Sequence, residues 1–124
     1  MKEIISVFLG GGVGSILRYA VQMMMHERIV AYNFPWATFT VNIVGSFLIG
    51  LFYALSAKFD FPAGVRLFLT AGLCGGFTTF STFSNDNMEM LRQGNGLICM
   101  LYIIFSLSLG ICSCFAAVSL CNKL

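Results

Sequence analysis

The sequence predicts an all-α integral membrane protein with four transmembrane helices in a single domain over residues 1–124. Hydrophobic residues make up 58% of the chain and charged residues only 10%, whereas charged residues make up about 25% of an average soluble domain. A soluble domain of this size would need a polar surface, and this chain has too few polar residues to cover one. In addition, four apolar stretches reach the length of about 20 residues that crosses a bilayer.

A polar segment separates the first two stretches. The first helix is expected over residues 4–25 and ends at the polar residues 26–28, which a loop to Pro35 follows. The second helix is expected over residues 36–57 and begins with Trp36, an amphipathic ring suited to a membrane interface. Because the loops are short, neighbouring helices should be antiparallel.

The third helix, expected over residues 62–91, has an unusual middle. Adjacent glycines and β-branched threonines are poor helix formers, so the segment Gly75–Thr79 predicts a break. Broken helices at membrane depth tend to line cavities or bind ions. The alternative is that Gly75 and Gly76 only allow close helix packing, and the residues alone leave both open. The fourth helix is expected over residues 97–121.

Several function classes are excluded by what the chain lacks. Its net charge of +2 is too small to indicate a nucleic-acid partner. Its five cysteines are odd in number and lie in apolar stretches, so no disulfide and no metal-ligand role is expected for them. There is no Ser-His-Asp set, and we expect no enzyme. The acidic residues lie in or near loops or toward the end of the third helix, whereas proton-coupled transporters usually need a buried acid.

Basic residues give only a weak topology signal. Four of them (positions 2, 58, 66 and 123) fall on one side of the predicted membrane and two (positions 28 and 92) on the other. This shallow bias is compatible with a poorly fixed orientation, with insertion in both orientations, or with chance in a small count.

A few polar residues stand inside the predicted helices. Gly10 and Gly14 have the GxxxG spacing of a close-packing surface. Arg18 follows on the same helix, where it faces a watery vestibule or reaches the nearby interface. Asn42 of the second helix must face another helix or a pore, because an unpaired amide is costly in the bilayer core.

Rings and hydroxyl groups alternate after the predicted break. Phe80 and Phe83 share one helix face, and hydroxyl groups are dense between Thr78 and Ser84. The fourth helix adds Tyr102 and Ser106 one turn apart. Hydroxyl and amide protons can replace the water around an anion, and aromatic ring edges carry positive partial charge. The residues alone therefore predict a pathway for a small polar solute or an anion.

Three motifs resemble those of a known family, the Fluc or CrcB fluoride channels. They are Gly11-Gly12-x-Gly14-x-x-x-Arg18-Tyr19, Thr40-Val41-Asn42-x-x-Gly45-Ser46-Phe47 and Gly75-Gly76-Phe77-Thr78-Thr79-Phe80-Ser81-Thr82-Phe83-Ser84. The resemblance covers nearly the whole chain, and the last motif is long and specific.

This resemblance implies a passive fluoride channel that lowers cytoplasmic fluoride. It implies an antiparallel, dual-topology homodimer with two pores in a bacterial inner membrane, which would account for the weak charge bias. It also implies a structural Na⁺ at the dimer interface, held by backbone carbonyls of Gly75 and Thr78, and this favours the broken helix. The implied fluoride pathway consists of Asn42, Phe80, Phe83, Ser81, Thr82, Ser84 and Tyr102, with Arg18 supporting the pore entrance.

Two other functions compete with this interpretation. A small four-helix multidrug or cation exporter would share the length and the weak charge bias, but it would need a membrane-embedded Glu in the first helix, where none is found. A purely structural membrane subunit would not need the rings and hydroxyl groups after the break.

Overall fold

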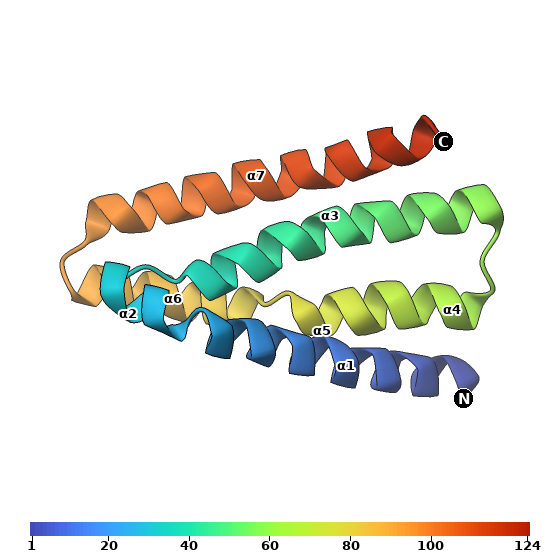
Figure 1. Ribbon diagram of the computed structural model, residues 1–124, viewed down its shortest axis with the longest axis horizontal. Coiled ribbons are helices and arrows are strands. Elements are labelled where there is room, and N and C mark those ends of the chain that lie inside the picture. Colours follow the sequence, from blue (N-terminus) through green and yellow to red (C-terminus); the bar gives the residue numbers. More distant parts are fainter.

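The computed structural model describes the backbone of residues 1–124 and every side chain except that of Tyr32. The described backbone is helical and contains no strand. Four segments are long and apolar enough to cross a membrane, so the chain is a multi-pass membrane protein. The elements are α1 (Lys2–Met24), α2 (His26–Tyr32), α3 (Trp36–Phe59), α4 (Ala63–Leu67), the π-helix η1 (Phe68–Cys74), α5 (Gly75–Phe77), α6 (Phe80–Arg92) and α7 (Gly96–Asn122) (Figure 1).

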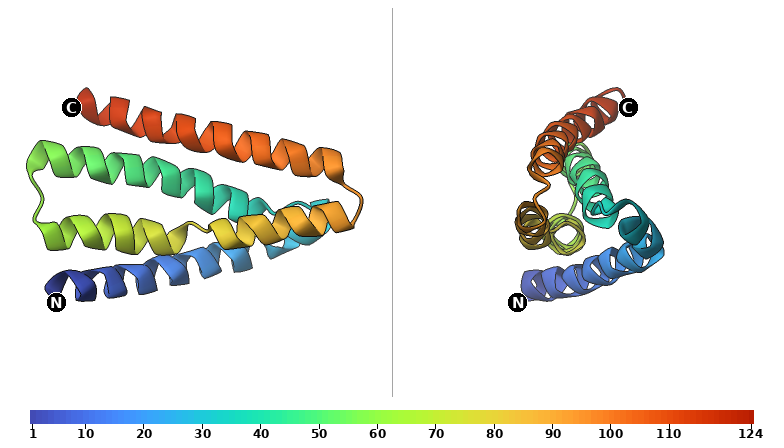
Figure 2. Two further views of the ribbon diagram at one scale, coloured as in Figure 1. Left: turned by 180° about the vertical axis from the view of Figure 1, so that it is seen from behind. Right: turned by 90° about the vertical axis from the view of Figure 1, so that its left-hand side faces the viewer.

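The four spans pack as two pairs. Helix α1 lies along the third span, which consists of α4, η1, α5 and α6, and α3 lies along α7 (Figure 2). Both chain termini lie at the same end of the bundle (Figure 1). This arrangement follows from an even number of spans joined by short connections.

Glycines bring α1 and the third span into backbone contact. A Cβ atom on Gly14 would lie 2.9 Å from the Phe77 nitrogen and closer still to the Leu73 carbonyl oxygen. A Cβ atom on Gly76 would lie 3.0 Å from the Ser15 nitrogen. The close-packing surface predicted at Gly10 and Gly14 is therefore confirmed.

A cluster of buried side chains lies at the end of the bundle away from the termini. Met90, Cys99 and Tyr102 are buried there, and the rings of Phe39 and Phe83 pack against them. The outer faces of the bundle are apolar, with Phe8 77% exposed on α1 and Phe115 71% exposed on α7. Apolar surface on this scale suits contact with lipid or with another subunit.

The structure differs from the expected helix limits in three places. The expected loop before Pro35 is wrong, because residues His26–Tyr32 form α2. The π-helix Phe68–Cys74 was not expected. In the segment Gly75–Thr79, the backbone is helical at Gly75 and becomes extended only at Thr78 and Thr79.

Candidate functional site

The candidate site is built around two extended residues between α5 and α6. Thr78 has φ −85° and ψ 160°, and Thr79 has φ −151° and ψ 119°. The Cys74 carbonyl closes the end of α5 by accepting from the Thr78 backbone N–H at 3.0 Å and from its hydroxyl at 2.9 Å. Thr79 then begins α6, because its hydroxyl oxygen accepts from the Thr82 backbone N–H at 3.2 Å.

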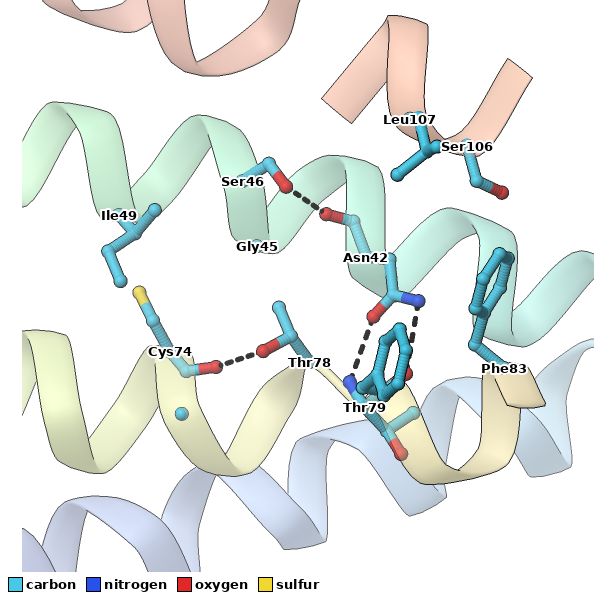
Figure 3. Close-up of a pocket in the computed structure, with 12 residues that line it drawn as sticks. Asn42, Gly45, Ser46, Ile49, Cys74, Thr78, Thr79, Phe83, Ser106 and Leu107 are labelled. Carbon is cyan, nitrogen blue, oxygen red and sulfur yellow. Dashed lines mark hydrogen bonds between the residues drawn. The ribbon is translucent and has the colours of Figure 1, made fainter. Parts of the chain in front are cut away.

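Asn42 of α3 holds this extended backbone with both ends of its amide. Its Nδ2 donates to the Thr79 carbonyl at 3.2 Å, and its Oδ1 accepts from the Thr79 N–H at 2.8 Å (Figure 3). In a continuous helix the Thr79 N–H would donate to the Gly75 carbonyl. These two bonds, the Asn42–Thr79 clamp, therefore satisfy the backbone N–H and carbonyl of Thr79, for which lipid offers no partner. They leave the Gly75 carbonyl without the N–H that would donate to it in a continuous helix.

Arg18 of α1 reaches the same region from the other side. Its Nε donates to the Gly76 carbonyl at 3.1 Å, and the side chain is half-buried. Of the two alternatives for Arg18, this bond favours an inward position over a reach to the interface. A small cavity of about 10 Å³, just large enough for one water-sized particle, lies beside Arg18 and is lined also by Gln22, Thr38 and Thr82.

A larger groove of about 300 Å³ opens between α3, the third span and α7. Its lining combines polar groups with apolar side chains, and the described residues that line it include no carboxylate. The Ser106 hydroxyl is buried at this groove without a hydrogen-bond partner among the described residues. The lining residues are Asn42, Gly45, Ser46, Ile49, Cys74, Gly75, Thr78, Thr79, Phe80, Phe83, Ser106 and Leu107, most of which Figure 3 labels.

Three aromatic rings follow one another at the groove. The centroids of Phe80 and Phe83 lie 6.0 Å apart, and those of Phe83 and Tyr102 lie 4.9 Å apart. Phe83 is partly buried against the core, whereas Phe80 is 78% exposed. The structure thus places Asn42, Phe80 and Phe83, three residues of the expected pathway, at one groove, while Tyr102 lies behind them, 1% exposed.

Sequence reasoning missed an acidic residue, Asp86, beside these three aromatic rings. The Tyr102 hydroxyl donates to Asp86 Oδ2 at 3.1 Å, and Asp86 is half-buried in α6. The sequence analysis placed this acid near the end of the third helix and gave it no role. Its spacing could have indicated otherwise, because Asp86 lies three residues after Phe83 and four after Thr82, on the face that looks into the bundle.

The hydroxyl groups expected to form a track do not share one environment. Ser81 is exposed, and its Oγ lies 3.3 Å from the Thr79 hydroxyl. Thr82 is partly buried beside Arg18, and its hydroxyl accepts from that of Thr79 at 3.1 Å. Ser84 is exposed, and its hydroxyl donates to the Phe80 carbonyl at 3.0 Å.

Comparisons with known proteins agree on one family. The family model described as "CrcB-like protein, Camphor Resistance (CrcB)" matches residues 5–118. The chain is 49% identical over 118 residues to a protein of Bacteroides fragilis named "Fluoride-specific ion channel FluC", with 94% of this chain and 93% of that protein covered. Proteins of the same name are 50% identical over 111 residues in Phocaeicola vulgatus, with 90% and 91% covered, and 42% identical over 125 residues in Flavobacterium psychrophilum, with both chains covered fully.

Proposed function

The chain belongs to the CrcB-like protein family, and from this membership we propose that it is a passive, fluoride-selective channel that lets fluoride leave the cytoplasm. It is a channel protein and not an enzyme. The observation that carries the proposal is the groove of neutral donors and phenylalanine rings at the interrupted third span, together with full-length relatives named as fluoride channels.

The groove has the chemistry that a strongly hydrated small anion needs. The Ser106 hydroxyl, which has no partner among the described residues, and the second Nδ2 proton of Asn42 can replace lost water, and the positive edges of Phe80 and Phe83 attract the ion. Neutral groups hold an anion weakly enough to release it, whereas a ring of fixed cations would retain it. Arg18 adds one positive charge nearby, with its Nε already used by the Gly76 carbonyl.

We further propose that the working unit is an antiparallel, dual-topology homodimer with two pores in the cell inner membrane. Phe80 is 78% exposed in the single chain, and Ser81, Ser84 and Asn85 are exposed on the same helix, within the candidate membrane span Ala63–Arg92. Lipid offers such polar groups no hydrogen bond. A second copy would cover them and would close the open side of the groove.

A structural Na⁺ between the two copies fits the groups present. Gly75 is exposed, its carbonyl lacks a helical donor because Asn42 takes the Thr79 N–H, and a hard cation prefers oxygen ligands. Backbone carbonyls of Gly75 and Thr78 would hold the ion, which would tie the two interrupted spans together. Replacing Na⁺ by N-methylglucamine during dialysis should weaken the dimer or reduce its fluoride flux. An unchanged dimer and flux would count against an exchangeable site.

Efflux from liposomes tests the function directly. Purified protein is reconstituted into liposomes loaded with potassium fluoride and potassium chloride, valinomycin is added, and fluoride and chloride electrodes follow both anions. We expect rapid fluoride loss with chloride retained. If a well-folded protein releases no fluoride, the channel proposal is wrong and a small four-helix multidrug or cation exporter becomes the alternative.

Phe80 separates a channel from a structural subunit. Phe80→Ile removes the ring edge and, because Phe80 is 78% exposed, should leave the fold of the chain intact. Fluoride efflux should fall severely, while elution as a dimer stays normal. Phe115→Ile is a matched control, since Phe115 of α7 is 71% exposed and lies outside the groove. Equal efflux from both variants would remove the ring-edge argument.

A further inference from the structure

Hydroxyl groups near the groove differ in where their protons go. Within a helix, a serine or threonine hydroxyl often donates to the carbonyl four residues earlier. A proton bound in this way cannot also serve an anion. The hydroxyls of Ser46, Thr70, Thr78 and Ser84 all form this bond, at 2.7, 2.8, 2.9 and 3.0 Å respectively.

Ser81 and Thr82 stand in a different position. They lie in the first turn of α6, so the carbonyls four residues earlier belong to Phe77 and Thr78, across the extended backbone. Neither hydroxyl donates to those carbonyls in the described structure; both instead contact the Thr79 hydroxyl, at 3.3 and 3.1 Å. At the interruption, these two hydroxyl groups therefore lack the carbonyl acceptors that a continuous helix would offer them.

Thr79 gives this small network a direction. Its oxygen accepts from the Thr82 backbone N–H at 3.2 Å, and its own single proton goes to the Thr82 hydroxyl oxygen at 3.1 Å. Ser81 can then donate to Thr79, because the Thr79 oxygen has a second lone pair. Thr82 thus already accepts, and its own proton points away from Thr79.

The Thr82 hydroxyl, the last donor in this series of hydrogen bonds, lies beside the guanidinium of Arg18. Thr82 and Arg18 both line the small cavity of about 10 Å³. Its wall is mixed, because polar Gln22, Thr38 and Thr79 adjoin it together with apolar Ala37 and Val41. Hydrogen bonds arranged head to tail polarise one another, so the last donor in the chain is strengthened. A hydroxyl proton directed away from Thr79, next to a guanidinium, suits an anion, and the positive charge of Arg18 disfavours a cation.

We propose that Thr79 is a positioning residue for anion selectivity, which orients the chain Ser81–Thr79–Thr82 so that Thr82 presents a proton to the passing anion beside Arg18. The proposal rests on the channel function proposed above and adds a residue to it. It also gives the Thr79 side chain a role separate from that of its backbone, which Asn42 holds.

The test must separate this role from the Thr79 hydroxyl's cap on α6. Thr79→Val removes both, whereas Thr82→Val removes only the oriented hydroxyl and keeps the backbone N–H that Thr79 caps. Fluoride efflux is measured for the wild type, both single variants and the double variant. If Thr79 acts through the Thr82 hydroxyl, the two effects are not additive.

We expect Thr79→Val to lower fluoride efflux about ten-fold or more, the scale of one hydrogen bond to an ion. Thr79→Ser should restore efflux to within about two-fold of the wild type, since it returns the hydroxyl. In the Thr82→Val background, Thr79→Val should change efflux by less than about two-fold. Equal losses in both backgrounds, or no loss from Thr79→Val alone, would overturn the proposal.

A replacement variant and a second measurement cover the cases in which Thr79→Val does not fold or efflux is too small to measure. If Thr79→Val does not fold, Thr79→Gly is used in the same cycle, because glycine at this position retains most of the capping strength. Where efflux is too small to measure, the rise in melting temperature caused by sodium fluoride is compared in the same four proteins. A wild type without fluoride efflux would instead refute the channel function, independently of Thr79.

Discussion

Replacing Gly14 by alanine tests the contact that sets α1 against the interrupted span. The new Cβ atom would lie 2.9 Å from the Phe77 nitrogen and closer to the Leu73 carbonyl oxygen, and both neighbours are backbone atoms. A helix backbone cannot turn aside as a side chain can, so the two spans must separate by about 1 Å, an overpacking that typically costs about 1–3 kcal/mol.

The same separation would strain the bond between Arg18 and the Gly76 carbonyl, which now measures 3.1 Å. A hydrogen bond to a charged group contributes about 1.5–3 kcal/mol, and the higher helix propensity of alanine returns about 1 kcal/mol. We therefore expect Gly14→Ala to lower the free energy of unfolding by about 2–4 kcal/mol, and fluoride efflux to fall because the interruption is displaced.

Gly12→Ala provides a matched control on the same helix, because a Cβ atom on Gly12 meets nothing within 4 Å. Unfolding is titrated with dodecyl sulfate and followed by the fluorescence of Trp36, the single tryptophan of the chain. The Gly12 variant should be as stable as the wild type or slightly more stable. If the Gly14 variant unfolds together with the Gly12 variant, the backbone contact does not govern this packing.

Three further substitutions test other parts of the site. Asn42→Ala leaves the N–H and carbonyl of Thr79 without partners, so dodecyl sulfate titration should show a loss of about 2–4 kcal/mol and efflux should fail; wild-type efflux would show that the clamp is dispensable. Tyr102→Phe keeps the ring but deprives Asp86 of its donor; the same titration should show a loss of about 1–3 kcal/mol, and no change would mean that water replaces the hydroxyl. Gly94→Ala places a side chain at φ 78° and should cost about 1–2 kcal/mol without altering efflux per folded protein; lowered efflux would tie this turn to conduction.

Hydropathy and length were sufficient to predict the four spans. Each span is a long apolar run bounded by polar residues, and lipid forces such runs to be helical, so little else can compete. The short helix α2 was not predicted because the segment His26–Tyr32, with three polar residues before four hydrophobic ones, is too short for an apolar period that would distinguish it from a loop. The π-helix Phe68–Cys74 was not predicted because its sequence suits an α-helix equally well.

The candidate site was predicted in part by residue type and in part by resemblance. Asn42 and Phe80 stand out because an amide in a span and a ring within a run of hydroxyls each need an explanation. The Asn42–Thr79 clamp could not be derived, since it joins residues 37 positions apart. The pairing of Asp86 with Tyr102 was missed for the same reason, because distance along the chain conceals which helices meet.

The clamp has a consequence for how the protein is made. Among the described residues, the side chain of Asn42, in the preceding span, hydrogen-bonds both the N–H and the carbonyl of Thr79. A third span that enters the bilayer before α3 lies beside it would leave both groups unpaired in hydrocarbon, at several kcal/mol each. The third span should therefore insert as one continuous helix and open at Thr78 and Thr79 only when α3 docks. In such an order of events, the interruption is a product of assembly between neighbouring spans and not a property of the segment that contains it.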